Sequence, residues 1–263
     1  MAYSALSVEK SNRIATVSLN RPEKLNSLNR AIVDELTRVV DDLDKDDEIR
    51  SVIITGKGKN FSAGGDLEDL MKFDYTDKRA IVESVRAYDL LILRLTRLKK
   101  PMIAAINGQA IGGGCCLSLC CDIRIAAEDA TLWFPFIRLG IAGTDMGSSW
   151  LLPRIVGLGK ASELLLVGDS ISSREALEIG LVNKVVPPDQ LLKEANSLAM
   201  KMAAGPPLGL EMTKAALFRT YSTDLESQLE YEVAVQSFCL GTEDLQEGLK
   251  CLLEKRAPIF KGK

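Results

Sequence analysis

The chain of 263 residues contains no histidine. This absence excludes Ser-His-Asp and Cys-His triads, imidazole general bases and histidine-ligated metals. Acid–base chemistry must therefore use carboxylates, lysine, tyrosine, cysteine or backbone dipoles. A basic excess is also lacking, because 33 Lys and Arg stand against 36 Asp and Glu, for a formal net charge of -3. We therefore expect no nucleic-acid partner.

Membrane spans, a secretory leader and a disulfide framework are also lacking. The longest apolar run, Met102 to Ile125, is broken by polar residues and three glycines, so we expect no contact with a membrane. The N-terminus has no basic region followed by an apolar one. Four of the six cysteines fall within residues 115–121, which is not the spacing of a disulfide framework. Together these features predict a cytoplasmic protein.

The clustered cysteines are also a poor metal site. Cys116 and Cys120 are four residues apart and would share one face of a helix. Structural zinc sites, however, draw their ligands from separated knuckles, and no histidine completes a set in this chain. We therefore predict that the cysteines pack as small apolar side chains, and we expect no metal.

Strand and helix patterns alternate through the first two thirds of the chain. Strand-like segments cover residues 14–19, 51–55, 102–106 and 122–126, and helical spacing covers residues 28–43, 81–98 and 117–121. This alternation predicts an α/β architecture with parallel crossovers. Beyond Ser148 the pattern is almost wholly helical, with breaks at residues 187–188 and 205–207. The expected division is a core over residues 1–188 and a helical region over residues 189–263.

Two glycine-containing turns carry the strongest chemical signal. The first, NFSAGGDL over residues 60–67, follows a strand, and the second, NGQAIGGG over residues 107–114, lies between a strand and a helix. Glycine allows the backbone to approach a ligand closely and leaves N–H groups free to point outward. One N–H from each turn would form a two-donor oxyanion hole. Tight packing between strand and helix is the structural alternative.

With these turns the chain resembles the enoyl-CoA hydratase/isomerase (crotonase) superfamily over essentially its whole length. The matching segments, in order, are RPEKLNSL, FSAGGDL, PMIAAINGQAIGGG, CDIRIAAEDA, LLPRIVG, GLVNKVVP and TEDLQEG…LEKRAPIFKGK. The resemblance implies a spiral core of ββα repeats followed by a helical trimerisation region. It also implies that the chain binds acyl-CoA thioesters, assembles as a homotrimer or hexamer, and needs no cofactor beyond the coenzyme A of its substrate.

The resemblance assigns roles to individual residues. Gly65 and Gly113 match the pair whose N–H groups hold the thioester oxygen. The residues that match family contacts to CoA are Lys24, Leu25, Ala63, Asp66, Leu67, Phe260 and Lys263. The last two resemble C-terminal residues that often reach CoA from a neighbouring subunit. For the two lysines, a solvated surface position is the alternative. The aromatic residues expected either to line the acyl pocket or to pack in the core are Trp133, Phe134, Phe136 and Trp150.

Two positions depart from the hydratases of this family. Cys116 and Phe136 stand where the resemblance places two glutamates. Hydration needs one carboxylate to activate water and another to deliver a proton. Phenylalanine cannot transfer a proton, and burial in an apolar helix should raise the pKa of the Cys116 thiol. The known machinery for hydration is therefore missing at these positions.

One carboxylate remains near the expected site. Asp145 matches, by its spacing to LLPRIVG, an aspartate of isomerases and dehalogenases in this superfamily, of which the dehalogenases also use a histidine. The alternative is that Asp145 caps a helix beginning near Ser148. The sequence thus favours enoyl-CoA double-bond isomerisation, with Asp145 as the catalytic proton carrier. Hydration by a non-standard route and an acyl-CoA-binding pseudoenzyme stay open as alternatives.

Overall fold

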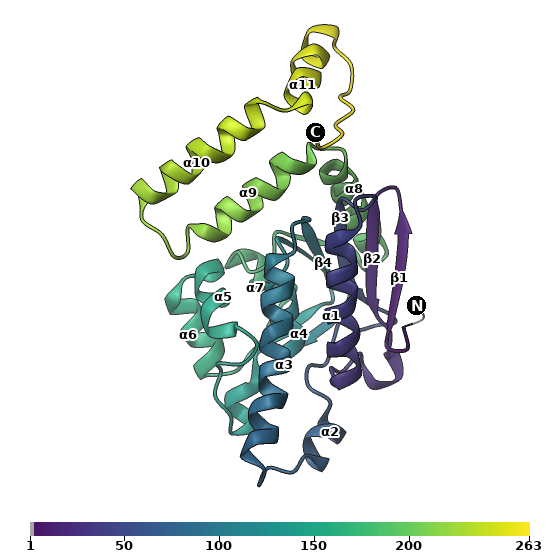
Figure 1. The fold of residues 1–263 in the computed structure, drawn as a ribbon. Coiled ribbons are helices and arrows are strands. Elements are labelled where there is room, and N and C mark those ends of the chain that lie inside the picture. Colours follow the sequence, from purple (N-terminus) through teal and green to yellow (C-terminus); the bar gives the residue numbers. More distant parts are fainter. Residues whose placement is uncertain (1–2) are drawn as a thin grey trace.

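The computed structural model describes residues 3–263, and its core is a mostly parallel sheet (Figure 1). Within these residues the larger sheet has six strands in the order β1-β2-β3-β4-β6-β9. They are β1 (Leu6–Ser11), β2 (Ile14–Leu19), β3 (Ser51–Gly56), β4 (Met102–Ile106), β6 (Ile123–Ala127) and β9 (Lys184–Val186). From β2 to β9 all neighbouring pairs are parallel, which confirms the predicted crossovers.

The pattern of apolar residues explains which strands are central. Every residue of β3 and β4 is buried, as is typical of parallel strands covered on both faces. β1 and β2 pair antiparallel and are joined by Asn12 and Arg13, whose φ angles are 52° and 64°. Two successive residues with positive φ are typical of the tight turns that match the twist of a hairpin.

Helices pack on this sheet and on one another. α1 (Arg30–Lys45) and α3 (Lys78–Arg97) lie side by side, and both are in front of the sheet in Figure 1. The buried residues of α1 recur at the spacing of an amphipathic helix: Ile32, Val33, Leu36, Val39, Val40 and Leu43. The remaining short helices of the core are α2 (Leu67–Lys72), α4 (Gly113–Leu119), α5 (Ser148–Val156), α6 (Leu158–Leu166), α7 (Ser173–Glu178), and the 3-10 helices η1 (Pro22–Lys24), η2 (Pro135–Leu139) and η3 (Pro188–Gln190).

A second sheet, of three strands within the described residues, supports the glycine turns. Its strands are β5 (Gln109–Ile111), β7 (Thr131–Trp133) and β8 (Ser170–Ser172). β5 leads directly into the glycine run, and an isolated bridge joins Ser62 of the first turn to Ala110. β8 and β9 fall in the stretch predicted to be almost wholly helical, so that prediction is wrong there. Strands of three residues are too short for an alternating pattern to be visible.

The boundary predicted after residue 188 falls too early. α8 (Leu191–Ala203) lies beyond it, but this helix packs against β2, β3, β4 and β6 through its buried leucine and alanines. The helices that stand away from the core follow the break at Gly205 and Pro206 (Figure 1). They are α9 (Pro207–Arg219), α10 (Leu225–Leu240) and α11 (Glu243–Glu254). The core therefore includes α8.

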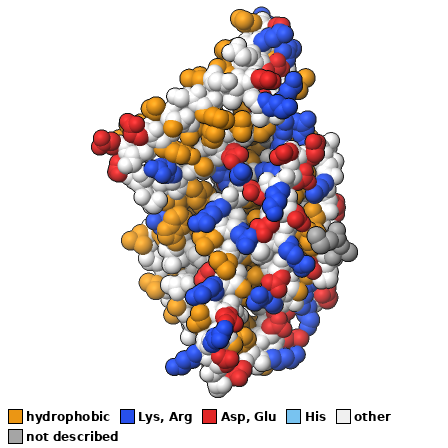
Figure 2. Space-filling view, viewed as in Figure 1, with side chains coloured by type: hydrophobic (Ala, Val, Ile, Leu, Met, Phe, Trp, Pro, Cys, Tyr) orange, Lys and Arg blue, Asp and Glu red, His pale blue; other side chains and the backbone are white. Residues whose placement is uncertain are grey.

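The projecting helices expose many apolar side chains. In Figure 2 hydrophobic atoms gather along α9 and α10, whereas charged side chains of both signs cover the face over α1. The exposed apolar residues of α10 and α11 include Leu225, Leu229, Val233, Phe238, Leu240, Leu249, Leu252 and Leu253. Exposed apolar surface of this extent is typical of an interaction site. Separately, none of the helices in residues 3–263 has the length and apolar character needed to span a membrane.

Candidate active site

The two glycine turns lie directly against each other. The N–H groups of Phe61 and Ser62 both donate to the Gln109 carbonyl, at 3.1 Å each. In the other direction, the Ile111 N–H donates to the Ser62 carbonyl at 2.9 Å. The first turn is therefore held on β5, immediately before the glycine run begins at Gly112. The fold brings together the two segments that the sequence singled out.

The contact between the turns leaves no room for side chains at two glycines. A Cβ on Gly114 would lie 2.5 Å from the Ser62 carbonyl oxygen, and one on Gly64 would lie 2.5 Å from the Ile111 carbonyl oxygen. Gly64 also has a φ of +79°, which residues with side chains rarely adopt. Its Cβ would lie 3.3 Å from the Gly113 nitrogen. The turns thus meet backbone to backbone.

Gly65 and Gly113 each have a backbone N–H without an acceptor among the described residues. Leu28 bonds to the residues on either side of Gly65: its N–H donates to the Gly64 carbonyl (2.6 Å), and its carbonyl accepts from the Asp66 N–H (3.0 Å). Gly113 is the first residue of α4, where N–H groups have no intrahelical acceptor. Within residues 3–263 neither N–H donates a hydrogen bond. The oxyanion hole formed by these two groups therefore stays a prediction.

The two positions that lack glutamate are apolar and closed to proton transfer. Cys116 is buried in α4, and its thiol donates to the Asp145 carbonyl at 3.6 Å. Burial raises the pKa of this thiol well above its usual range, which confirms the expectation from the sequence. Phe136 is buried in η2, where its ring lies 3.6 Å from the position of a Cβ on Gly112. The side chains at these positions supply apolar surface beside the glycine run.

The neighbouring cysteines also pack as small apolar residues. Cys115, Cys120 and Cys121 are buried, and their thiols donate to backbone carbonyls rather than to one another. Burial raises the pKa of Cys115 and of Cys121 to about 12. A thiol with such a pKa is neutral at physiological pH and is therefore a poor nucleophile. The prediction that these residues serve packing is confirmed.

Asp145 is the carboxylate that the fold places beside the glycine run. It is half-buried in the loop between η2 and α5. The next residue, Met146, is buried with its sulfur 2.9 Å from the position of a Cβ on Gly113. Met146 has a φ of +47°, a conformation that costs on the order of 1 kcal/mol or more for a residue with a side chain. Burial raises the pKa of Asp145, and the negative charge of Asp89 raises it further.

The alternative role of Asp145 as a helix cap is wrong. α5 begins at Ser148, Gly147 occupies the cap position, and no side chain caps the helix. Asp145 contributes only its backbone carbonyl, which accepts from the Ser148 N–H at 2.9 Å. The reason is geometric: Gly147 adopts a left-handed conformation that turns the chain into the helix. The carboxylate of Asp145 is therefore not used to start α5.

Four of the residues predicted to contact CoA lie at one edge of the first glycine turn. The Leu25 carbonyl accepts from the Ala63 N–H at 3.0 Å, which joins η1 to the turn. Lys24 forms an ion pair with Glu68 of α2, and Leu67 begins the same helix with its side chain exposed. Lys24 is thus paired with Glu68 rather than free at the surface, and its contact with a phosphate of CoA is untested. Contact with CoA stays a prediction for all four residues.

Asp66 holds the first glycine turn in place. Its carboxylate accepts hydrogen bonds from the Arg21 guanidinium (2.9 Å), the Ser27 hydroxyl (3.0 Å) and the Glu68 N–H (3.1 Å). Burial alone would raise the pKa of Asp66, but the bonds from Arg21 and Ser27 hold it below its usual range. The carboxylate therefore has a structural role that the sequence did not reveal. The predicted contact with CoA does not account for its burial.

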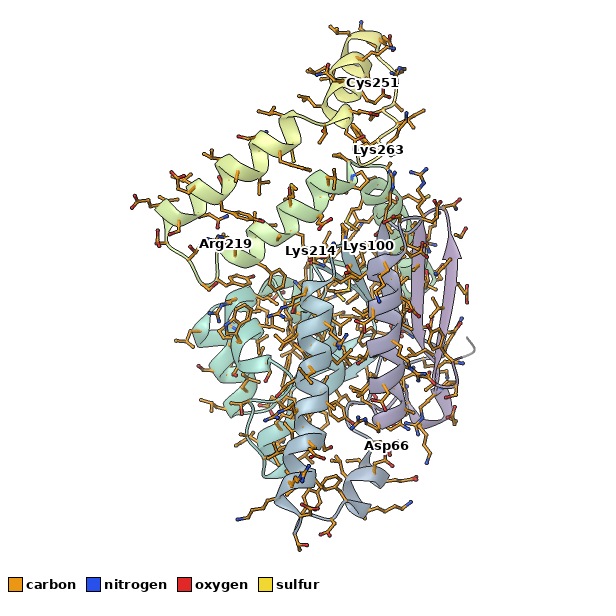
Figure 3. All side chains as sticks on the ribbon, viewed as in Figure 1. Asp66, Lys100, Lys214, Arg219, Cys251 and Lys263 are labelled. Atoms are coloured by element: carbon orange, nitrogen blue, oxygen red, sulfur yellow. The ribbon has the colours of Figure 1, made fainter. Side chains whose placement is uncertain are left out.

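Phe260 and Lys263 lie at the opposite end of the molecule from the glycine turns. Figure 3 places Lys263 below α11, and Asp66 at the far end of the core. The Lys263 carbonyl accepts from the Glu243 N–H at 2.7 Å, and the Phe260 ring lies 3.7 Å from the position of a Cβ on Gly248. A single chain does not bring these two residues to the site. Their predicted contact with CoA requires a second copy of the chain.

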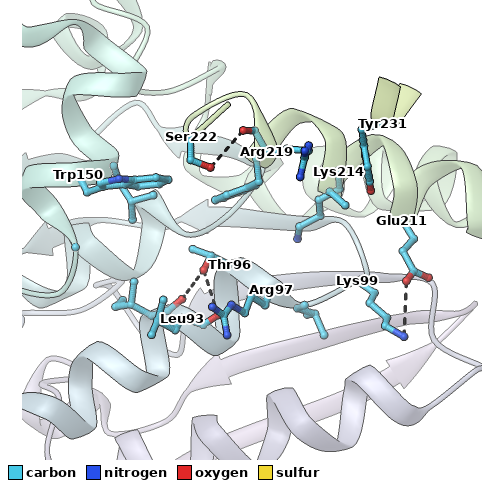
Figure 4. Close-up of a pocket in the computed structure, with 16 residues that line it drawn as sticks. Leu93, Thr96, Arg97, Lys99, Trp150, Glu211, Lys214, Arg219, Ser222 and Tyr231 are labelled. Carbon is cyan, nitrogen blue, oxygen red and sulfur yellow. Dashed lines mark hydrogen bonds and ion pairs between the residues drawn. The ribbon is translucent and has the colours of Figure 1, made fainter. Parts of the chain in front are cut away.

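A cavity of about 870 Å³ reaches the segment that follows Asp145 (Figure 4). It lies between α3, α5, α9 and α10, and its lining includes Ile92, Gly147, Trp150, Leu151, Lys214 and Phe218. Neither Gly65 nor Gly113 lines it. Of the aromatic residues expected near the acyl group, Trp150 lines this cavity and Phe134 is wholly buried in the core. Of these two residues, Trp150 therefore lines a cavity and Phe134 packs in the core.

The sequence patterns did not point to Tyr88 and Asp89 on α3. The Tyr88 hydroxyl donates to the Leu28 carbonyl at 3.3 Å. Burial raises the pKa of Tyr88, and the charges of Asp69 and Asp145 raise it further. Asp89 acts on Asp145 as described above. The sequence analysis assigned residues 81–98 to a helix and gave neither residue a role.

Comparisons with known proteins agree with this architecture. A family model described as enoyl-CoA hydratase/isomerase matches residues 9–263. The chain is 36% identical to the short-chain-enoyl-CoA hydratase of Clostridium acetobutylicum, with 95% of this chain and 94% of that protein covered. It is 37% identical to the crotonyl-CoA hydratase of Syntrophomonas wolfei over 100% of both chains. A crystal structure of an enoyl-CoA hydratase from Bacillus anthracis superposes with a TM-score of 0.95 at 36% identity, covering 99% of this chain and 100% of that one.

The fold is therefore the crotonase fold, in which a spiral α/β core is followed by projecting helices. The chain belongs to the enoyl-CoA hydratase/isomerase family and is an acyl-CoA enzyme of the crotonase superfamily. This finding confirms the resemblance drawn from the glycine turns and their neighbouring segments. The named relatives are hydratases, so they favour hydration over the isomerisation that the sequence favoured.

Proposed function

We propose that this chain adds water to the double bond of an enoyl-CoA thioester. Two observations support the proposal. Full-length relatives are named as hydratases of short-chain enoyl-CoA and crotonyl-CoA. In addition, the half-buried Asp145 precedes Met146, whose sulfur packs at Gly113, and within residues 3–263 the N–H groups of Gly65 and Gly113 donate no hydrogen bond. The names of the relatives carry the choice of hydration, and the site would supply a proton carrier and donors for the thioester oxygen if Asp145 served as both base and acid, a non-standard route.

The first step forms the carbon–oxygen bond. The water oxygen attacks the β-carbon while Asp145 takes a proton from that water. The π electrons of the double bond move toward the thioester oxygen, where negative charge develops. The N–H groups of Gly65 and Gly113 would hold this oxygen, and one such donor contributes about 3 kcal/mol in other enzymes.

The second step returns the proton. The enolate collapses as its α-carbon takes the proton from Asp145, so that one water has been added and the carboxylate is regenerated. A single group that accepts and then delivers a proton works best when its pKa is close to the working pH. The raised pKa of Asp145 moves it in this direction. The reaction neither oxidises nor reduces its substrate overall, and we propose no cofactor beyond the CoA of the substrate.

Double-bond isomerisation is the second candidate, and one observation favours it. Cys116 and Phe136 occupy the positions at which the resemblance places the two hydratase glutamates, and both are buried and apolar. Isomerisation needs only one carboxylate, which would take a proton from the α-carbon of a 3-enoyl thioester and return it to the γ-carbon. The same N–H groups would hold the dienolate oxygen.

The assembly forms part of the proposal. The exposed apolar side chains of α10 and α11 would be covered in a homotrimer or hexamer. Such an assembly would also allow Phe260 and Lys263 of one copy to reach the CoA bound by another. Light scattering tests this point, since a mass near 28.7 kDa at micromolar concentration, that of the monomer, would contradict it.

Product analysis tests the reaction. The protein is incubated with crotonyl-CoA and, separately, with a 3-enoyl-CoA in D₂O, and the products are identified by NMR. Formation of 3-hydroxybutyryl-CoA with deuterium at the α-carbon is the expected result. A 2-enoyl product from the 3-enoyl substrate, without hydration, would establish the second candidate instead. Binding heat by calorimetry without any product would identify an acyl-CoA-binding protein and overturn both reactions.

A further inference from the structure

The cavity of about 870 Å³ between the core and the projecting helices has a mostly apolar wall and an excess of cations (Figure 4). Its apolar lining includes Ile92, Leu93, Trp150, Leu151, Ala215 and Phe218. The charged side chains that line it are four cations and one carboxylate: Arg97, Lys99, Lys214, Arg219 and Glu211. Cavities of about 300–1,000 Å³ that combine apolar walls with a few charged groups are typical of small-molecule sites.

The two lysines of this cavity already have partners. The Lys99 ammonium lies 3.7 Å from the Glu211 carboxylate. The Lys214 ammonium is buried, forms an ion pair with Asp122 at 2.9 Å and donates to the Lys100 carbonyl at 3.0 Å. Neither lysine can bind a ligand fully without giving up one of these contacts.

The two arginines have no acidic partner. Within residues 3–263 neither Arg97 nor Arg219 takes part in an ion pair. The Arg219 guanidinium lies over the Tyr231 ring, 5.0 Å from its centre. Arg97 ends α3 on the lower wall of the cavity in Figure 4, and Arg219 ends α9 on the upper wall. Guanidinium groups stay charged at physiological pH and match the geometry of carboxylates and phosphates.

The cavity lies on a different side of α10 from the face assigned to the assembly. That face includes Leu229 and Val233, neither of which lines the cavity. Tyr231 does line it, and this residue is two positions from each of them. Residues two apart do not share a helix face. A homotrimer or hexamer joined through the exposed apolar face would therefore leave the cavity free for a ligand.

We propose that this cavity binds an amphiphilic anion, that is, an apolar chain with a carboxylate or phosphate head group. The head group binds Arg97 and Arg219, which are both exposed at the rim. The chain packs on Trp150 and on the buried side chains of Ile92 and Leu151. Neither glycine turn lines the cavity, so the inference does not depend on the proposed function.

The fluorescence of Trp150 tests the proposal directly. Trp133→Phe leaves Trp150 as the only tryptophan, and the Arg154 guanidinium lies 4.1 Å from the centre of its ring. The protein is titrated with dodecanoate and dodecyl phosphate, and with dodecanol and dodecyltrimethylammonium as the uncharged and cationic controls, all below their micelle-forming concentrations. We expect saturable binding of both anions and none of the cation. Dodecanol should bind about tenfold more weakly or worse, since it lacks the hydrogen bonds to a charged group.

Substitution of the arginines tests the head-group site. Arg97→Gln and Arg219→Gln should each weaken dodecanoate binding by about tenfold. Arg79→Gln, on the same helix as Arg97 but outside the cavity, is the matched control and should leave the affinity unchanged. Octanoate should bind more weakly than dodecanoate, by up to about fourfold for each CH₂ group that the cavity buries. Calorimetry on the wild type repeats the titrations without the Trp133 substitution.

Three results would overturn the inference. The first is equal affinity of the wild type and both arginine variants, because the arginines would then serve only the dipoles at the ends of their helices. The second is equal affinity for dodecanoate and dodecanol, which would mean that the cavity reads no charge. The third is the absence of any saturable signal, and light scattering on the same sample would then show whether a second copy of the chain fills the cavity.

Discussion

The two glycine turns and the segment from Phe136 to Asp145 are neighbours in space. Backbone contacts fix the structure of the turns, whereas side chains decide what the segment can do. In the turns, backbone meets backbone, and a Cβ at Gly64 or Gly114 would lie 2.5 Å from a carbonyl oxygen. In the second segment the backbone follows an irregular path, with a left-handed Met146, and the side chains decide the chemistry. At Gly64 and Gly114 a side chain could be placed only if the backbone shifted.

Because of this difference, membership of the family does not by itself determine which reaction a chain catalyses. The oxyanion donors come from backbone geometry, so any chain that keeps the glycines keeps the donors. The acids come from side chains, so substitutions such as Cys116 and Phe136 leave the fold intact while they remove the expected proton carriers. The chemistry then depends on which carboxylate carries the proton, and the proposed function gives that role to Asp145.

The largest expected effect tests the rigidity of the turns. Gly114→Ala places a methyl group 2.5 Å from the Ser62 carbonyl oxygen, where only the backbone can move. We expect a loss of about 3 kcal/mol or more in the free energy of unfolding, measured by urea titration. Gly159→Ala is the control, because nothing lies within 4 Å of its Cβ position in α6, and it should be neutral or slightly stabilising. Equal stability of the two variants would contradict the packing described here.

The next effect concerns turnover rather than folding. Gly113→Ala brings a methyl group to 2.9 Å from the Met146 sulfur and 3.0 Å from the Leu28 Cδ1 atom, both at the ends of flexible side chains. The protein should fold, but Met146 must shift and the oxyanion geometry changes with it. We expect kcat to fall by about 10²-fold with a smaller change in substrate affinity. An unchanged kcat in steady-state assays would contradict the expected dependence of the reaction on the position of Met146 beside Gly113.

A smaller effect should appear in the stability of Asp145→Asn. The folded state holds the pKa of Asp145 above its value in the unfolded chain, so ionisation of Asp145 destabilises the fold as pH rises through that folded pKa. Asparagine removes this cost, and the Tm at about pH 7 should rise by about 1–3 °C. The gain should vanish below about pH 4, where both states bind the proton. A lower Tm at neutral pH, measured by calorimetry, would mean that the carboxylate is stabilised in the fold.

The smallest effect is expected for Cys116→Ser. A hydroxyl can still donate to the Asp145 carbonyl. The Cys116 thiol keeps its proton at neutral pH because burial raises its pKa, so it takes no part in proton transfer. Turnover should stay within about threefold of wild type, well below the 10²-fold scale of general acid–base catalysis. A loss on that larger scale, at unchanged Tm, would transfer the proton-carrying role to the thiol.

Much of the fold could be predicted from the sequence because its long elements are strongly patterned. β2 and β4 have the predicted bounds, and α1 and α3 lie within about three residues of the predicted helices. The three-residue strands β5, β7, β8 and β9 could not be predicted, because tertiary contacts rather than local pattern define them. α8 was assigned to the wrong unit for the same reason, since only its packing on the sheet reveals that it belongs to the core.

In the candidate site, too, some residues could be predicted from the sequence and others could not. Both glycine turns and Asp145 were found from their sequence motifs. The structural role of Asp66 was not, because its hydrogen bonds to Arg21 and Ser27 join segments far apart in the chain. The packing of Ile92 in α3 against Gly147 joins residues more than fifty positions apart, and no local pattern encodes such a contact.

The kinetics of Asp145→Asn test the assignment of the proton carrier most directly. The variant keeps the shape of the side chain and loses its ability to accept a proton, so kcat on the competent thioester should fall by about 10²-fold or more. Calorimetric affinity for the same thioester should stay within about twofold, because the carboxylate acts on the reacting carbon and not on CoA. Asp129→Asn, in the exposed turn between β6 and β7, is the control and should keep full activity. An Asp145→Asn protein with wild-type kcat would contradict the assignment.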